Sequence, residues 1–285
     1  MEHLKSHLFE TDAVNVCKGD TPFWYTSGKI GPYFINTHFV YGSKDDAEKF
    51  LTFIDENKED KLHLPKKLFD QVLAQYENNA IYHNVVEEMI AFIRSHIPVE
   101  EIDYISGGER RDWFFSVIAA HLLQKPHITL FKDLSAVESD VSFEHTKEAT
   151  SLSGKKVLHI ADLMNQASSY IRAWIPAIQN LGGELVWSLV LVDYAQGGKE
   201  RLENLGIQSY SIAQLDKALF ETAYEMGMIN QEQLEVVKAF IDDPYGSMRQ
   251  FLISHPDFLE NALHSDEKTA GRAKLCIDGN LYNLA

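Results

Sequence analysis

The sequence has few of the residues that mark secreted or zinc-binding proteins. Its 285 residues include only two cysteines, Cys17 and Cys276, and no CxxC or Cys/His spacing of a zinc site. We expect two reduced thiols in a cytosolic protein, with a single disulfide as the alternative. The first residues, Met1 to Lys5, lack the basic and apolar regions of a signal peptide. No apolar run approaches the about 20 residues that cross a membrane.

Positive charge is also scarce. Lysine and arginine total 26 against 42 acidic residues, so the formal net charge is −16. Such a surface does not attract nucleic acid or an anionic membrane, and we expect neither as a partner. A phosphorylated small ligand is still compatible with this charge, because a local pocket of backbone N–H groups with a few Arg or Lys side chains is sufficient.

Short apolar segments alternate with helical patterns in the middle of the chain. Strand–helix alternation with almost continuously apolar strands indicates an α/β fold, a parallel central sheet flanked by helices. Ligands of such sheets bind beyond the carboxyl ends of the strands, so the loops that follow the strands are the candidate site. The expected strands cover residues 104–105, 128–131, 157–160, 185–192 and 207–212.

The pattern divides the chain into three regions. Residues 1–100 are expected to form an N-terminal hood and helical region, residues 101–215 the α/β core, and residues 216–285 a helical C-terminal extension. Residues 58–79 are charged and then weakly helical, which is typical of a surface insertion. Residues 133–153 are polar and long for a loop in a compact domain, which favours a functional lid.

The first candidate segment is Val157–Ser169. A buried strand runs into Asp162, then into a small polar loop, then into a helix. This order presents backbone N–H groups and a helix N-terminus to an anion. The alternative is an ordinary helix cap by Ser168 or Ser169. His159, inside the apolar strand, is expected to be a hydrogen-bonded core residue.

The second candidate segment follows the strand at 104–105. Gly107 and Gly108 are expected in a turn where the backbone approaches a ligand closely. Arg110 and Arg111 would then bind phosphate or pyrophosphate through their paired N–H groups. The alternative is that these arginines form weak surface pairs with neighbouring carboxylates, such as Glu109.

The third candidate segment is Thr26–Asn36, which contains Ser27-Gly28-Lys29 and the aromatic pair Tyr33-Phe34. Its two alternatives are a hood that covers a base and a tight hairpin whose aromatic face packs on the core. Periodicity does not distinguish them.

In this order and spacing, the three segments resemble the orotate phosphoribosyltransferases. Thr26–Asn36 resembles the family's hood motif, and Gly107 falls at its pyrophosphate loop. Phe131-Lys132 stands where a strand leads into the family's flexible catalytic loop. Val157–Ser169 is similar to its signature for phosphoribosyl pyrophosphate (PRPP). The resemblance covers about residues 22–219, apart from residues 58–79.

The resemblance implies a parallel sheet with a small hood, a homodimer, and transfer of a phosphoribosyl group between PRPP and a base. Mg²⁺ would be held mainly through PRPP, and no residue is assigned to a metal. Asp162 would contact the ribose, while Lys132 or His145 would assist the departure of pyrophosphate. The implied ligand-binding residues are Ser27, Gly28, Lys29, Phe34, Gly107, Gly108, Arg110, Arg111, Asn165, Gln166, Ala167, Ser168, Ser169 and Tyr194.

Several positions depart from the family pattern. Ala161 replaces the first of two adjacent acids, Ala167 replaces a glycine, Thr26 replaces a lysine and Tyr194 replaces an arginine. Our leading hypothesis is a cytoplasmic protein of nucleotide metabolism that binds PRPP or a nucleotide and, when active, transfers a phosphoribosyl group. The alternatives are a non-catalytic nucleotide sensor on the same scaffold and an interaction module whose helical tail binds a partner.

Overall fold

The structure is a computed structural model that describes residues 3–19 and 21–284. The chain forms two compact units. The core unit contains the chain up to Ala13 together with Asn36–Leu215, and the small unit contains Val14–Ile35 together with the chain from Asp216. The expected N-terminal region of residues 1–100 is therefore wrong as a unit, because residues 14–35 pack with the C-terminal helices.

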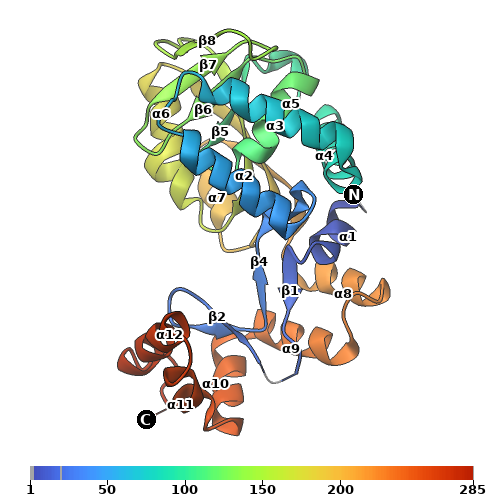
Figure 1. The fold of residues 1–285 in the computed structure, drawn as a ribbon, viewed down its shortest axis with the longest axis vertical. Coiled ribbons are helices and arrows are strands. Elements are labelled where there is room, and N and C mark those ends of the chain that lie inside the picture. Colours follow the sequence, from blue (N-terminus) through green and yellow to red (C-terminus); the bar gives the residue numbers. More distant parts are fainter. Residues whose placement is uncertain (1–2, 20, 285) are drawn as a thin grey trace. The chain divides into compact units, whose positions relative to one another are not determined.

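A seven-stranded sheet forms the centre of the core unit (Figure 1). Five neighbouring strands, β11-β10-β9-β5-β6, run parallel, and β7 and β8 continue the sheet antiparallel. This confirms the expected α/β class and all five expected strands. The strands are β5 (Tyr104–Gly108), β6 (His127–Leu130), β7 (Ala136–Ser139), β8 (Thr146–Glu148), β9 (Lys156–Met164), β10 (Glu184–Asp193) and β11 (Gln208–Gln214).

Helices flank this sheet, as Figure 1 shows. Helix α5 (Trp113–Leu122) connects β5 to β6 and packs on β5, β6 and β9. The π-helix η3 (Tyr170–Trp174) and α6 (Ile175–Asn180) connect β9 to β10, and α7 (Gly198–Glu203) connects β10 to β11. The other helices of the core unit are α1 (His3–Glu10), η1 (Thr37–Tyr41), α2 (Lys44–Asn57), α3 (Leu64–Asn78), α4 (Ala80–His96) and η2 (Val99–Glu101).

The expected lid at residues 133–153 is wrong. Most of this segment is the antiparallel pair β7–β8, which pairs Val137 with Glu148 and extends the sheet beyond β6. Buried side chains hold it down, because Phe143 between the two strands is fully buried and Leu152 after them is too. The segment is mostly polar, so its composition did not indicate that a few apolar side chains are buried.

The expected surface insertion at residues 58–79 is also wrong. Helix α3 buries Leu64, Leu68, Phe69 and Val72 and packs on α4 and α5. The ring of Phe69 stacks on that of Phe143, with centroids 4.8 Å apart and planes 8° apart. Offset aromatic stacking adds to the area that the two rings bury, so α3 is part of the core.

The small unit contains two short antiparallel strand pairs and helices. Strand β1 (Val14–Val16) pairs with β4 (Tyr33–Ile35), and β2 (Phe23–Trp24) pairs with β3 (Ile30–Gly31). Trp24 stacks on Phe258 at 5.5 Å, and the backbone N–H of Ile30 donates to the Tyr282 hydroxyl. The helices are α8 (Lys217–Glu225), α9 (Gln231–Asp242), α10 (Pro244–Ser254), α11 (Phe258–Leu263) and α12 (Glu267–Asp278). Within the described residues, no helix is both long and apolar enough to span a membrane.

The burial of α3 gives a stability prediction. We expect Phe69→Ala to lower the free energy of unfolding by about 3–5 kcal/mol, because it removes a buried ring and leaves a cavity beside Phe143. Urea denaturation measures this change. Leu62→Ala, at a side chain that is 46% exposed, is the matched control and should stay within about 0.5 kcal/mol of wild type. Equal effects of the two substitutions would mean that α3 does not belong to the core.

Candidate functional site

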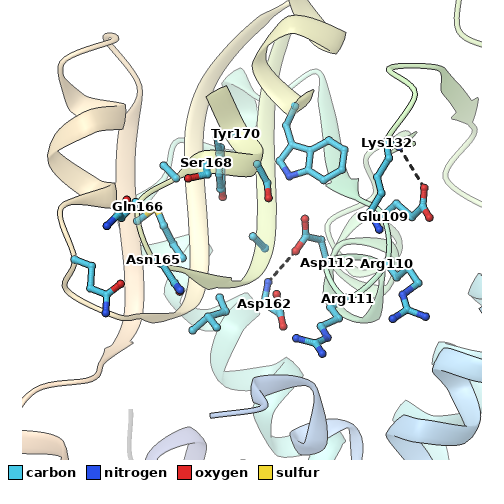
Figure 2. A pocket seen from close by; sticks show the side chains of 17 residues that line it. Glu109, Arg110, Arg111, Asp112, Lys132, Asp162, Asn165, Gln166, Ser168 and Tyr170 are labelled. Carbon is cyan, nitrogen blue, oxygen red and sulfur yellow. Dashed lines mark hydrogen bonds between the residues drawn. The ribbon is translucent and has the colours of Figure 1, made fainter. Parts of the chain in front are cut away.

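A cavity of about 590 Å³ lies in the core unit, at the carboxyl ends of β5 and β9 (Figure 2). This is the edge at which ligands of parallel sheets bind. The chain between β5 and α5 forms one side, and the chain between β9 and α6 forms the other. Its lining residues are Glu109, Arg110, Arg111, Asp112, Lys132, residues 161–170, Trp174 and Gln196.

The loop after β9 leads directly into a helix. Strand β9 ends at Met164, residues 165–167 turn, and helical structure begins at Ser168. Asn165, Gln166, Ser168 and Ser169 all line the cavity with exposed polar side chains. This arrangement brings polar side chains and the first N–H groups of a helix to one end of the cavity, which suits an anion.

Two residues fix the shape of this loop. Ala167 is buried and has a φ of 53°, in the left-handed region. Arg201 of α7 donates a hydrogen bond from Nη1 to the carbonyl oxygen of Gln166, at 2.8 Å. Sequence reasoning anticipated the unusual Cβ at Ala167. It missed Arg201, because that residue follows the loop by 35 positions and belongs to no recognised motif.

Asp112 ties the ends of β5 and β9 together. Its Oδ2 accepts from the backbone N–H of Gly108 at 3.1 Å, and its Oδ1 accepts from the backbone N–H of Asp162 at 3.2 Å. Asp112 directly precedes α5, but its side chain makes no capping hydrogen bond to that helix. The carboxylate instead accepts hydrogen bonds from the backbones of β5 and β9.

Gly107 and Gly108 do not form the expected turn. Both lie within β5, buried, and pair with Thr129 and Leu130 of β6. A Cβ on Gly107 would overlap the Ser116 side chain, and one on Gly108 would overlap the Trp174 indole. These glycines therefore make room for the side chains of Ser116 and Trp174.

His159 has the core role that the sequence predicts. The residue is fully buried, and its Nδ1 forms a 2.9 Å hydrogen bond with Ser106 Oγ. Its Nε2 lies 3.5 Å from Asp112 Oδ2. The imidazole is thus a core residue that lies close to the Asp112 carboxylate without a hydrogen bond to it.

Asp162 is the most perturbed acid of the site. Its pKa is raised to about 7, first by burial and then by the nearby Asp112 carboxylate, while the Arg111 guanidinium opposes both effects. Its Oδ2 has no hydrogen-bond partner in the described chain. Figure 2 shows Asp162 between Asp112 and Arg111. Close to neutral pH, this carboxyl can accept or donate a hydrogen bond, as a general acid–base group does.

The basic residues of the pocket differ in their availability. Arg110 forms an ion pair with Asp55 of α2. Lys132 lines the pocket, and its backbone N–H donates to Glu109 Oε2 at 3.2 Å. Among the residues that the structure describes, neither the Arg111 guanidinium nor the Lys132 ammonium group forms a hydrogen bond or an ion pair, so both cations are available to a ligand.

Several predicted site residues lie outside this pocket. Ser27, Gly28, Lys29 and Phe34 belong to the small unit, where Gly28 has a φ of 82° and lies against Leu275 of α12. Strands β2 and β3 pair as a hairpin that includes the first part of this segment.

Two further predicted residues, His145 and Tyr194, belong to the core unit but are absent from the lining of this cavity. His145 is 87% exposed in the β7–β8 hairpin and bonds to Asp140. Tyr194 follows β10, and its N–H donates to the Met164 carbonyl oxygen at 2.8 Å. The structure therefore brings together nine of the predicted residues, namely Arg110, Arg111, Lys132, Asp162, Asn165, Gln166, Ala167, Ser168 and Ser169.

The comparisons with known proteins concern the fold. No family model matches the sequence. A solved UMP synthase from Leishmania donovani matches with a TM-score of 0.56 and 19% identity, over 84% of this chain and 41% of that one. An orotate phosphoribosyltransferase from Francisella tularensis matches with a TM-score of 0.52 and 14% identity, over 82% and 95%. The chain has the orotate phosphoribosyltransferase fold. It spans about two fifths of the UMP synthase.

The raised pKa of Asp162 gives a pH prediction. In the unfolded chain this carboxyl loses its proton near pH 4, whereas the folded protein keeps it to about pH 7. Folding stability therefore falls between these values as pH rises. Asp162→Asn removes this fall, and we expect its melting temperature to exceed that of wild type by more at pH 8 than at pH 5.

A matched control for this prediction is Asp133→Asn. A hydrogen bond from Lys61 lowers the pKa of Asp133, so this carboxyl is ionised in both states from pH 5 to pH 8. The difference between this variant and wild type should be the same at both values. A parallel response of the two variants would mean that Asp162 is not the group that titrates.

The left-handed backbone at Ala167 gives a further prediction. A left-handed backbone costs a residue with a Cβ about 1–2 kcal/mol, and glycine does not have this cost. Glycine also has more conformational freedom in the unfolded chain, which offsets part of the stability gained. We expect Ala167→Gly to raise the free energy of unfolding by about 0.5–1 kcal/mol. Ala161→Gly, in strand β9, should lower it by about 1 kcal/mol. Loss of stability in both variants by urea denaturation would contradict this account.

Proposed function

We propose that this pocket binds a phosphorylated ribose compound, PRPP or a nucleotide, and that the chain acts in nucleotide metabolism. The observation that carries the proposal is the loop at residues 165–169. It brings polar side chains and a helix start to one end of a cavity whose other end holds Arg111 and Lys132. The fold shared with the Francisella tularensis orotate phosphoribosyltransferase supports the same function.

Different residues of the pocket would bind different groups of the ligand. Backbone N–H groups and hydroxyls of Ser168 and Ser169 would hold the 5-phosphate, with Arg201 next to the loop adding positive charge. Asp162, which lines the cavity, would bind a ribose hydroxyl. Arg111 and Lys132 would stabilise negative charge at the other end.

The pocket does not fit a Mg²⁺ ion held by the protein. Asp162, the acid between the two sides, has a pKa raised to about 7, which makes it a poorer ligand for Mg²⁺ than an ionised carboxylate or a phosphate. No group of three or more candidate ligands gathers anywhere in residues 3–19 and 21–284. Mg²⁺ would enter only with the oxygens of PRPP, and the roles proposed here do not involve it.

Phosphoribosyl transfer between PRPP and a base is the reaction that this arrangement would support. Asp162 and Lys132 are then the candidate catalytic residues, whereas His145 has no place in the pocket. The single acid at Asp162, with Ala161 beside it, favours the second candidate, a nucleotide sensor without transfer. The homodimer and the cytoplasmic location stay predictions.

Binding measurements test the proposal. We expect calorimetric titration of wild type to show binding of UMP or of PRPP with Mg²⁺ at concentrations up to the millimolar range. Ser168→Glu places a negative charge where the 5-phosphate would bind and should weaken binding by about tenfold or more. Ser151→Glu, at an exposed site away from the pocket lining, is the control.

Two results would contradict the proposal. One is that folded wild-type protein binds neither ligand. The other is that Ser168→Glu binds as wild type does. Release of pyrophosphate from PRPP in the presence of a base would decide in favour of the transferase over the sensor.

A further inference from the structure

We infer that Lys61, in the connection between α2 and α3, is a positioning residue that holds the turn from which Lys132 reaches the cavity. This inference rests on the function proposed above, in which Lys132 stabilises negative charge on the ligand. Lys132 is exposed, and its ammonium group forms no hydrogen bond or ion pair with any residue that the structure describes. Its place at the cavity therefore depends on how its backbone is held.

Lys132 lies in the tight turn between β6 and β7. The N–H of Phe131 donates to the carbonyl oxygen of Ser135 at 3.0 Å, and the N–H of Leu134 donates to that of Phe131 at 3.0 Å. Leu134 has a φ of 69°, the left-handed conformation that commonly ends a three-residue hairpin loop. The backbone around Lys132 is therefore a defined turn and not an open loop.

Lys61 contacts this turn on both sides of Lys132. Its Nζ forms an ion pair with Asp133 and donates a hydrogen bond to Ser135 Oγ at 2.9 Å. The same ammonium group lies over the Phe131 ring, 5.0 Å from the ring centroid. A cation at this distance is attracted to the face of an aromatic ring. One side chain thus binds the residue before Lys132 and the residue after it.

The Asp133 carboxylate strengthens this contact. The hydrogen bond from Lys61 is the main cause that lowers the pKa of Asp133 to about 2, so the carboxylate is ionised near neutral pH. Its Oδ1 also accepts from the N–H and the hydroxyl of Ser135, at 3.1 and 2.7 Å. A single exposed ion pair contributes little to stability, whereas a network of bonds among the same residues restrains them together.

The segment that carries Lys61 is itself anchored. Thr146 of β8 donates from Oγ1 to the carbonyl oxygen of Leu62 at 2.5 Å. Lys67 of α3 donates from Nζ to Asn57 Oδ1 at 2.9 Å, and α3 packs on α4 and α5. Lys61 therefore reaches the turn from a part of the core unit that is held in place.

Glu109 restrains Lys132 from the cavity side. Its Oε2 accepts the N–H of Lys132 at 3.2 Å (Figure 2), and its own N–H donates to the Leu130 carbonyl oxygen at 3.0 Å. The backbone of Lys132 and both of its neighbours are thus held, while its ammonium group stays available. A cation on a backbone that is already ordered loses less entropy on binding an anion than one on a mobile loop.

Calorimetric titration with PRPP and Mg²⁺ tests this inference, with UMP as a second probe whose single phosphate would bind at residues 165–169. We expect Lys61→Ala to weaken PRPP binding about fivefold and UMP binding by less than about twofold. Lys61→Arg keeps a cation for Asp133 and the Phe131 ring and should bind PRPP within about twofold of wild type. Circular dichroism establishes that the variants are folded.

Two further variants separate positioning from a loss of charge. Asp133→Asn removes a negative charge, and by electrostatics alone it would tighten the binding of an anion. Positioning predicts the opposite, a weakening of PRPP binding by about threefold, because Lys61 loses its partner. In a Lys132→Ala background, Lys61→Ala should change PRPP binding by less than about 1.5-fold, since the effect passes through Lys132.

Lys66→Ala is the matched control. Lys66 is 33% exposed, as Lys61 is, and it pairs with Asp70 and Glu144, which both lie outside residues 131–135. Its replacement removes the same charge from a neighbouring position. We expect this variant to bind both probes as wild type does.

Four results would overturn the inference and leave the proposed function intact. They are PRPP binding of wild-type strength by Lys61→Ala, an undiminished effect of that change in the Lys132→Ala background, tighter PRPP binding by Asp133→Asn, and wild type that binds UMP but not PRPP. In the last case Lys132 would meet no charge on the ligand. Wild type that binds neither probe would instead contradict the proposed function, and this inference with it.

Discussion

The bonds that Asp112 makes at the ends of β5 and β9 are the constraint on which the site depends. The pairing of the parallel strands β5 and β9 ends at Ser106 and His159, and the N–H groups of Gly108 and Asp162 lie beyond this last pair. A buried carboxylate that accepts one N–H from each strand satisfies both donors. Removing that acceptor would leave two buried donors without partners, which is costly. The positions of Asp162 and of the loop after it follow from this tie.

The same carboxylate sets the electrostatics of the pocket. Burial raises the pKa of Asp162 most, and the neighbouring Asp112 carboxylate raises it further, so Asp162 does not ionise at its usual pH. Asp162 therefore keeps a proton near neutrality and behaves as a hydrogen-bonding group more than as a fixed charge. Arg111 opposes this effect only in part. The Asp112 carboxylate that holds the strand ends together thus also affects the protonation of Asp162, and with it the hydrogen bonds that Asp162 can make to a ligand.

The sequence predicted the sheet well because continuous apolar strands have no other stable environment. It failed at α3 and at the β7–β8 hairpin for a common reason. Each segment is mostly polar and is held by a few buried side chains, such as Phe69 and Phe143, which contact each other across 74 positions of the chain. Such pairing is a tertiary property that no local period reveals. The segment that resembles a hood formed its hairpin, but it packs with helices that the resemblance did not cover.

The candidate site was predictable where its residues are consecutive and unpredictable where they meet across elements. The loop Asn165–Ser169 was found from the order of strand, acid, polar loop and helix. Asp112, Trp174 and Asp55 were missed because each acts on a residue of another segment. Gly108 is the instructive case. The indole of Trp174 leaves no room for a side chain at this position. A bound phosphate close to the backbone would also exclude a side chain there. A glycine in a motif therefore indicates a close neighbour and leaves open whether that neighbour is ligand or protein, and here the protein itself fills the space.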